Sequence, residues 1–134
     1  VGRGNFFRQS FPFVIQDILK APMKTVLGID LVVRNAAIGG IPSFPYGFCL
    51  EHFLGGGGSE PHNSPPDVIS WDYSMNEGSK DASVLESFLR QASRQLKNHP
   101  MMILLDHTPK RLQLLQDYTA KGYLVDAIAV GKSE

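Results

Sequence analysis

A short apolar strand followed by a polar loop is clearest in residues 67–77, whose sequence is DVISWDYSMNE. The same order occurs earlier in the chain, where the apolar residues 29–33 run into residues 34–40, RNAAIGG. In a parallel α/β sheet, such loops lie side by side at the carboxyl edge, where ligands bind. A glycine amide from one loop and an asparagine side chain from the other are therefore expected to point at one oxygen atom, as in an oxyanion hole.

The chain alternates between helical and strand patterns. Strands are predicted at residues 29–33, 68–71, 101–105 and 125–130. They are apolar throughout instead of alternating with polar residues, which is typical of a parallel sheet covered by helices on both faces. Right-handed crossovers between such strands give three layers. The predicted fold is α/β, a three-layer α/β/α sandwich with a mostly parallel sheet, in a single domain over residues 1–134.

Three helices have recognisable start and stop signals. These signals are a Ser10 cap with Pro22 as the end, a Ser83–Glu86 capping box, and a Thr108 cap followed by Pro109 and ended by Gly122. The apolar residues of each helix fall on one face. They are Val14, Ile15, Ile18 and Leu19 in the first helix, Val84, Leu85, Phe88, Leu89, Ala92 and Leu96 in the second, and Leu112, Leu115 and Tyr118 in the third.

Composition excludes several classes of protein. The 134 residues carry 13 basic and 13 acidic side chains, so the basic surface expected of a nucleic-acid-binding protein is missing and no nucleic-acid partner is predicted. No apolar run reaches the roughly 18 residues of a transmembrane helix. The chain begins with Val1 and has no signal peptide, so we expect an excerpt of a longer protein or a processed product. The sequence does not indicate a cellular compartment.

Residues 41–66 are predicted to form a long loop, because they contain several prolines and the run from Gly55 to Gly58. This glycine run lacks the Gly-Lys-Ser/Thr ending of a phosphate-binding loop, so we interpret it as a flexible tip. The single cysteine, Cys49, is interpreted as a small buried apolar residue. The histidines lack further ligands at metal-binding spacing, and no metal or cofactor is expected.

Two motifs resemble the SGNH, or GDSL-like, hydrolases. Residues 35–40, NAAIGG, resemble the second block of that family, and residues 67–77 resemble its third block. The resemblance implies a flavodoxin-like sheet, ester hydrolysis or acyl transfer, and an oxyanion hole formed by Gly40 and Asn76. The chain departs from the third block at Ser74, where the family has Gly, and at Glu77, where it has Asp.

The resemblance also implies parts that this chain does not contain. The block with the nucleophilic Ser would precede Val1, and the final Asp-x-x-His block is not present in the family's form, so neither nucleophile nor general base is assigned to a residue of this chain. The missing first strand would be central, between the second and third strands predicted above, residues 68–71 and 101–105. We expect another segment or a partner chain to complete the sheet.

Two functions remain open. The first is a portion of an SGNH-like ester hydrolase or acyl esterase that supplies the oxyanion hole for a small-molecule or carbohydrate ester, with residues 41–66 selecting the substrate. The alternative is a catalytically silent SGNH-like domain that serves as a binding or structural subunit of a larger assembly. A nucleotide-binding or anion-binding domain is a third option, although the Gly-x-Gly-x-x-Gly turn is missing.

Each candidate residue also has a structural interpretation. Gly40 can be explained by a loop that needs positive φ, and Asn76 by a helix cap or an Asx-turn. The hydroxyls of Ser10, Ser43 and Ser74 are accounted for by cap and turn roles. A surface role is predicted for the pair Asp106–His107, and core packing for Trp71 and Tyr73.

Overall fold

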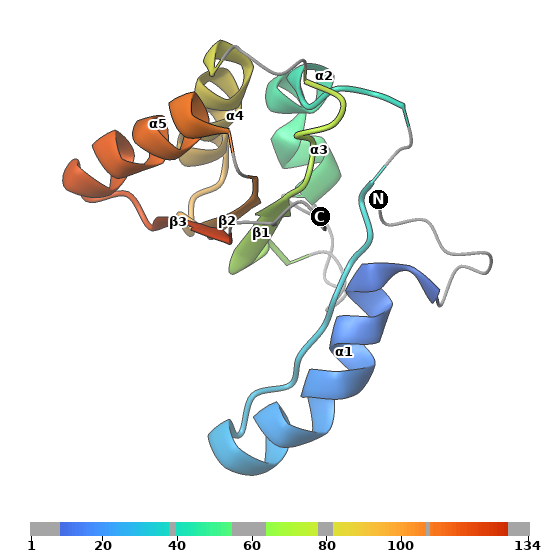
Figure 1. Ribbon diagram of the computed structural model, residues 1–134. Coiled ribbons are helices and arrows are strands. Elements are labelled where there is room, and N and C mark those ends of the chain that lie inside the picture. The colour runs from blue at the N-terminus through green and yellow to red at the C-terminus, as the bar shows by residue number, and fades with distance from the viewer. Residues whose placement is uncertain (1–8, 38–39, 55–63, 78–81, 107, 129–134) are drawn as a thin grey trace, which may run out of the picture. The chain divides into compact units, whose positions relative to one another are not determined.

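The computed structural model describes residues 9–37, 40–54, 64–77, 82–106 and 108–128 (Figure 1). The chain divides into two compact units, residues 1–40 and residues 41–134. The prediction of one domain over the whole chain stays a prediction.

The first unit contains a single long helical segment. Helix α1 (Phe11–Pro22) continues directly into the π-helical turn η2 (Met23–Leu27). The α-helix ends at Pro22 as predicted, but the helical segment does not, because it continues as a π-helical turn to Leu27. Proline cannot donate to the carbonyl four residues earlier, and a π-type turn is one way for a helix to accommodate such a break. The helical segment ends at Gly28, whose φ of 69° is the left-handed conformation that glycine adopts without strain.

The strand predicted at residues 29–33 is wrong, because these residues are irregular in the structure. The segment is held by side chains instead of by a neighbouring strand. The main-chain amide of Val33 donates to Oε1 of Gln16 at 2.7 Å, and Nδ2 of Asn35 donates to Oγ of Ser10 at 3.2 Å. A β-strand needs a partner for its backbone hydrogen bonds, and helix side chains supply some of those bonds here.

The second unit contains a parallel sheet with the order β1-β2-β3. The strands are β1 (Val68–Trp71), β2 (Met101–Leu105) and β3 (Val125–Ile128), which confirms three predicted strands over the described residues; residues 129–130 lie outside them. Strand β1 pairs directly with β2, with Ile69 opposite Met102. The prediction that a further strand lies between these two is therefore wrong.

Helix α4 (Ser83–Gln95) connects β1 to β2, and helix α5 (Pro109–Ala120) connects β2 to β3. Both crossovers proceed in the same direction along the sheet, so right-handed connections place both helices on the same face. Figure 1 shows α4 and α5 together on one side of the three strands. The described part of this unit is thus an α/β structure with helices on one face of an open sheet.

The core lies between this face and the helices. Every second residue of β1 and β2 is buried there, whereas β3 has only half-buried and exposed residues, and α4 contributes its predicted apolar stripe. The buried apolar residues are Ile69, Trp71, Met102 and Leu104 from the sheet, Leu85, Phe88, Leu89, Ala92 and Leu96 from α4 and its end, Leu115 and Tyr118 from α5, and Tyr46 and Leu50 from residues 44–54. Each Leu or Phe buried in this way contributes about 1.5–3 kcal/mol.

The ends of α4 and α5 test the predicted caps. Ala82, not Ser83, occupies the cap position of α4, and Glu86 pairs with Arg90 at 2.7 Å, so the predicted capping box is wrong. In α5, Thr108 is the cap residue and Pro109 is the first helical residue, as predicted. Gly122 follows the end of α5 with a φ of 87°, which confirms its role as a stop signal.

Two short helices lie where a long loop was predicted. Helices α2 (Phe44–Phe48) and α3 (Leu50–Leu54) both contact α4. Gln95 links them to α4, since its Nε2 donates to the Gly47 carbonyl at 2.9 Å and its Oε1 accepts from the Glu51 amide at 3.1 Å. Cys49 lies between the two helices and is exposed, so its predicted burial is wrong. The glycines at 55–58 lie outside the described residues.

Candidate functional site

The carboxyl end of β1 leads into a tight turn that carries Asn76. The amides of Asn76 and Glu77 both donate to the Tyr73 carbonyl, at 2.8 and 3.1 Å, so residues 73–77 form a single helix-like turn. The Asn76 side chain is exposed, and its Nδ2 donates to the Ile41 carbonyl at 3.1 Å. Asn76 is thus positioned at the carboxyl edge of the sheet, the edge at which open α/β sheets bind ligands.

A second hydrogen bond joins the same two segments. The Ser43 amide donates to Oε1 of Glu77, one residue beyond Asn76. Residues 41–43 therefore meet the turn at two points, through the side chains of Asn76 and Glu77. The carboxylate of Glu77 thus fastens the segment that follows Gly40.

Gly40 is the last residue of the first unit and is exposed. Its φ is 77°, and a Cβ at this position would meet nothing within 4 Å. Backbone conformation alone accounts for glycine here. Gly40 and Asn76 belong to different units, so a shared ligand remains a prediction.

A buried ion pair lies beside this turn. Asp106 directly follows β2, and Arg111 lies in the first turns of α5; Nη1 of Arg111 is 2.7 Å from Oδ2 of Asp106, and both side chains are at most 1% exposed. The other carboxylate oxygen accepts from the Thr108 amide and hydroxyl, each at 2.8 Å. The surface role predicted for Asp106 is therefore wrong, and His107 lies outside the described residues.

Two opposing effects set the pKa of Asp106. Burial raises it, because a buried carboxylate loses its hydration. The hydrogen bonds from Arg111 and Thr108 together outweigh burial and hold the pKa of Asp106 below its usual value. The carboxylate is consequently charged at neutral pH and balances the buried guanidinium.

The guanidinium of Arg111 also contacts the end of β1 and the turn. Nη2 donates to the Glu77 carbonyl at 3.2 Å, and Cζ lies 5.5 Å from the centre of the Trp71 ring. One planar group thus connects the ends of two strands and the turn that carries Asn76. Sequence analysis missed Arg111, whose only signal is its position shortly after the helix cap Thr108.

Aromatic rings pack against one another at the start of the turn formed by residues 73–77. Trp71 is buried, and its ring is 5.8 Å from Tyr73, which in turn is 5.8 Å from Tyr46. This confirms core packing for Trp71, and Tyr73 packs against the core from a half-buried position. Burial, with Tyr46 and Glu77 nearby, raises the pKa of the Tyr73 hydroxyl, which therefore stays protonated. Burial likewise raises the pKa of Asp72, which lies between Trp71 and Tyr73 in the chain.

The three serines considered as hydroxyl donors occupy turn and cap positions. Ser10 precedes α1 as its cap residue, Ser43 precedes α2, and Ser74 lies inside the turn at 73–77. The Ser43 hydroxyl is buried and, within the described part of the chain, finds no hydrogen-bond partner. Ser74 lies in a turn as predicted, but neither Ser10 nor Ser43 makes a capping hydrogen bond with its side chain, so the cap roles predicted for these two hydroxyls are wrong.

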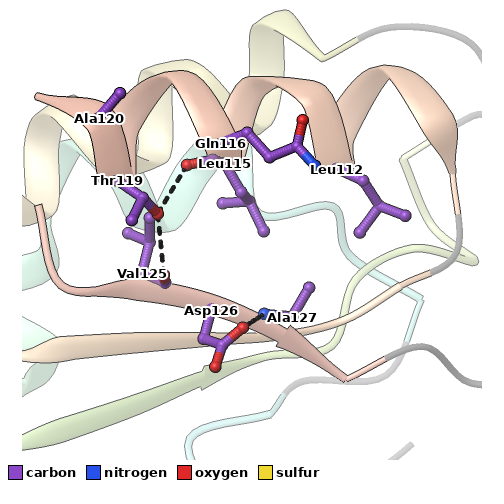
Figure 2. Close-up of a pocket in the computed structure, with 8 residues that line it drawn as sticks. All are labelled: Leu112, Leu115, Gln116, Thr119, Ala120, Val125, Asp126 and Ala127. Carbon is purple, nitrogen blue, oxygen red and sulfur yellow. Dashed lines mark hydrogen bonds between the residues drawn. The ribbon is translucent and has the colours of Figure 1, made fainter.

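A separate hollow of about 470 Å³ lies between α5 and β3 (Figure 2). Leu112, Leu115, Val125 and Ala127 give it an apolar lining. The Thr119 hydroxyl at its side is engaged with the carbonyls of Leu115 and Val125, at 3.0 and 3.2 Å. The hollow contains neither Asn76 nor the Asp106–Arg111 pair, so it is distinct from the carboxyl-edge site.

Metal ligands and membrane-spanning helices are both missing from the described residues. No group of three or more His, Cys, Asp or Glu residues in this part of the chain is arranged to hold a metal ion. None of the helices built from these residues combines the length and apolarity needed to cross a membrane.

Comparison with known proteins identifies no relative. No family model matches the chain, and no curated protein or solved structure matches it either. The functional interpretation therefore depends on the motifs and on the geometry of the carboxyl edge.

Proposed function

We propose that this chain is a portion of an SGNH-like ester hydrolase or acyl esterase and supplies its oxyanion hole. The Gly40 amide and the Asn76 side chain would donate to the oxygen that becomes negative when an ester carbonyl is attacked. The observation that supports this proposal is the pair of hydrogen bonds that fastens residues 41–43, directly after Gly40, to the turn that carries Asn76. The proposed substrates are small-molecule or carbohydrate esters.

The proposed chemistry is acyl transfer. A serine outside residues 1–134 would attack the ester carbonyl, a histidine would take its proton, and the alcohol would leave with that proton. Water would then hydrolyse the acyl-enzyme. The chain described here would stabilise the tetrahedral intermediate, and one such donor contributes about 3–4 kcal/mol to lowering the barrier.

We also propose that a third layer covers the sheet and that a further strand completes it. On the face of the sheet opposite α4 and α5, Val68, Met101 and Ile128 are exposed, and Ile103 and Leu105 are half-buried. Ser70 and Asp126 lie on the same face, which is therefore apolar only in part. Parallel sheets are usually covered on both faces, so a further layer on this face is expected. Strand β1 is an edge of the sheet that the described residues form, and a strand from another segment or a partner chain would pair with it.

One observation favours the alternative, a catalytically silent SGNH-like binding or structural subunit. The Asn76 carboxamide already donates to the Ile41 carbonyl, which is an architectural role. In an oxyanion hole, its second N–H group would serve the ligand, since a carboxamide has two donors.

A fluorophosphonate probe separates the two functions when it is applied to the full-length protein as encoded. The ester hydrolase is expected to be labelled at one serine and to hydrolyse p-nitrophenyl acetate, and heat-denatured protein serves as the control for non-specific labelling. A folded full-length protein with neither labelling nor turnover would contradict the ester hydrolase and support the silent subunit.

A further inference from the structure

The buried side chain of Arg111 contacts the turn that carries Asn76. Arg111 is 1% exposed, and its guanidinium contacts different parts of the unit. It pairs with Asp106 after β2, donates to the main-chain carbonyl of Glu77, and lies over the ring of Trp71 at the end of β1. This group thus connects two strand ends to the residue next to Asn76.

Fold stability alone does not require a charged pair at this position. Burying two charges removes their hydration, and apolar side chains of similar volume often stabilise a core equally well. The planar guanidinium, however, presents several donors in a fixed geometry, which lysine and apolar residues cannot reproduce. The contacts of Arg111 use this property, because Nη1 binds a side chain and Nη2 binds a main-chain carbonyl.

The hydrogen bonds continue from Arg111 to the segment after Gly40. The carbonyl of Glu77 is held by Arg111, while the carboxylate of Glu77 holds the Ser43 amide. Asn76 precedes Glu77 and is fastened to Ile41. A displacement of Glu77 would therefore change both links between the turn and residues 41–43.

We infer that Arg111, held in place by Asp106 and Thr108, is a positioning residue that fixes the orientation of the Asn76 carboxamide. It acts through the main chain of Glu77. The significance of this role for ester hydrolysis rests on the proposed function, whereas the positioning itself is a property of the fold and is measurable without a substrate.

The test is the conservative variant Arg111→Lys in the full-length protein, followed by ¹⁵N NMR of side-chain amides. Lysine keeps the positive charge beside Asp106 but lacks the planar guanidinium with its several donors. The Asn76 side-chain signals are expected to shift and to exchange with solvent faster, while those of Asn98 stay unchanged. The matched control is Arg90→Lys, because Arg90 pairs with Glu86 on the exposed side of α4. Unchanged Asn76 signals in a folded Arg111→Lys protein would overturn the inference.

A second variant covers the case in which Arg111→Lys does not fold. Asp106→Asn combined with Arg111→Met leaves no buried charge, and the carboxamide oxygen introduced at position 106 can still accept from Thr108. This protein is expected to show the same change in the Asn76 signals, and unchanged signals would again overturn the positioning role.

A kinetic measurement separates failure of this inference from failure of the proposed function. In an active enzyme, Arg111→Lys is expected to lower kcat about 10–100-fold with little change in KM, since small misplacements of catalytic groups have effects of this size. The effect should vanish in the Asn76→Ala background. Effects that multiply would contradict positioning through Asn76, whereas an inactive wild-type protein whose Asn76 signals depend on Arg111 would contradict the proposed function alone.

Discussion

Replacing Asp106 with asparagine will destabilise the second unit by about 3–5 kcal/mol, the typical cost of removing one partner from a buried ion pair. Asp106→Asn leaves the Arg111 guanidinium charged, buried and opposite a neutral side chain. Domains are stable by about 5–15 kcal/mol in total, so this loss is a large fraction of the stability. Urea unfolding at pH 7, followed by Trp71 fluorescence, measures it.

The contribution of Asp106 to the free energy of unfolding of the wild-type protein should depend on pH. The pKa of Asp106 is lower in the folded protein, so its contribution is complete above its unfolded pKa of about 3.9 and is lost as the pH falls through the folded value. The difference in unfolding free energy between wild type and Asp106→Asn is therefore expected to shrink below about pH 4. If the difference in unfolding free energy between the two proteins stayed constant from pH 7 down to acid unfolding, the lowered pKa of Asp106 would be contradicted.

The double variant Asp106→Asn/Arg111→Met is the control for charge burial. It should recover most of the stability lost in Asp106→Asn, because no unpaired charge remains in the core. A double variant as unstable as the single one would show that the cost comes from local packing and not from the buried charge.

If the full-length protein is the ester hydrolase proposed above, replacing Asn76 with alanine will lower its kcat by about 10²–10³-fold, the usual effect of removing one oxyanion donor. The transition state carries more charge on the carbonyl oxygen than the bound ester does, so KM should change little. Loss of the bond to the Ile41 carbonyl should cost only about 0.5–1.5 kcal/mol of stability. Initial rates with p-nitrophenyl acetate and urea unfolding measure the two effects.

Asn98→Ala is the matched control for Asn76→Ala. Asn98 is also exposed, and its Nδ2 donates to a main-chain carbonyl, that of Pro66, at 2.6 Å. It lies just before β2, at the amino edge of the sheet, so its removal should have a similar effect on stability and none on kcat. Equal losses of kcat in both variants would assign Asn76 to architecture.

The sequence predicted the elements whose signals are local. The apolar runs at 68–71 and 101–105 and the stripe of α4 need no distant information, and Thr108 with Gly122 marks α5 at both ends. The run at 29–33 has the same apolar character but is irregular, because a strand forms only where a neighbour supplies hydrogen bonds. Helices α2 and α3 were missed because five-residue helices depend on packing, here against α4, more than on propensity.

The candidate site was predictable only in part. The turn with Asn76 follows from a strand that ends in polar residues, and its position after β1 agrees with that prediction. Glu77 and Arg111 act on partners 34 residues away along the chain, and no local pattern indicates such contacts. A surface role was predicted for Asp106, since its pairing with Arg111 becomes evident only in the structure.

The central proposal is that the Gly40 amide and the Asn76 carboxamide bind one oxygen atom, and NMR of the phosphonylated protein tests it most directly. The full-length ¹⁵N-labelled protein is treated with a fluorophosphonate, whose phosphoryl oxygen takes the place of the oxyanion. The account predicts that the Gly40 main-chain signal and the Asn76 side-chain signals move together on labelling, while the Asn98 signals do not. Labelling that leaves either the Gly40 or the Asn76 signal in place would contradict the account.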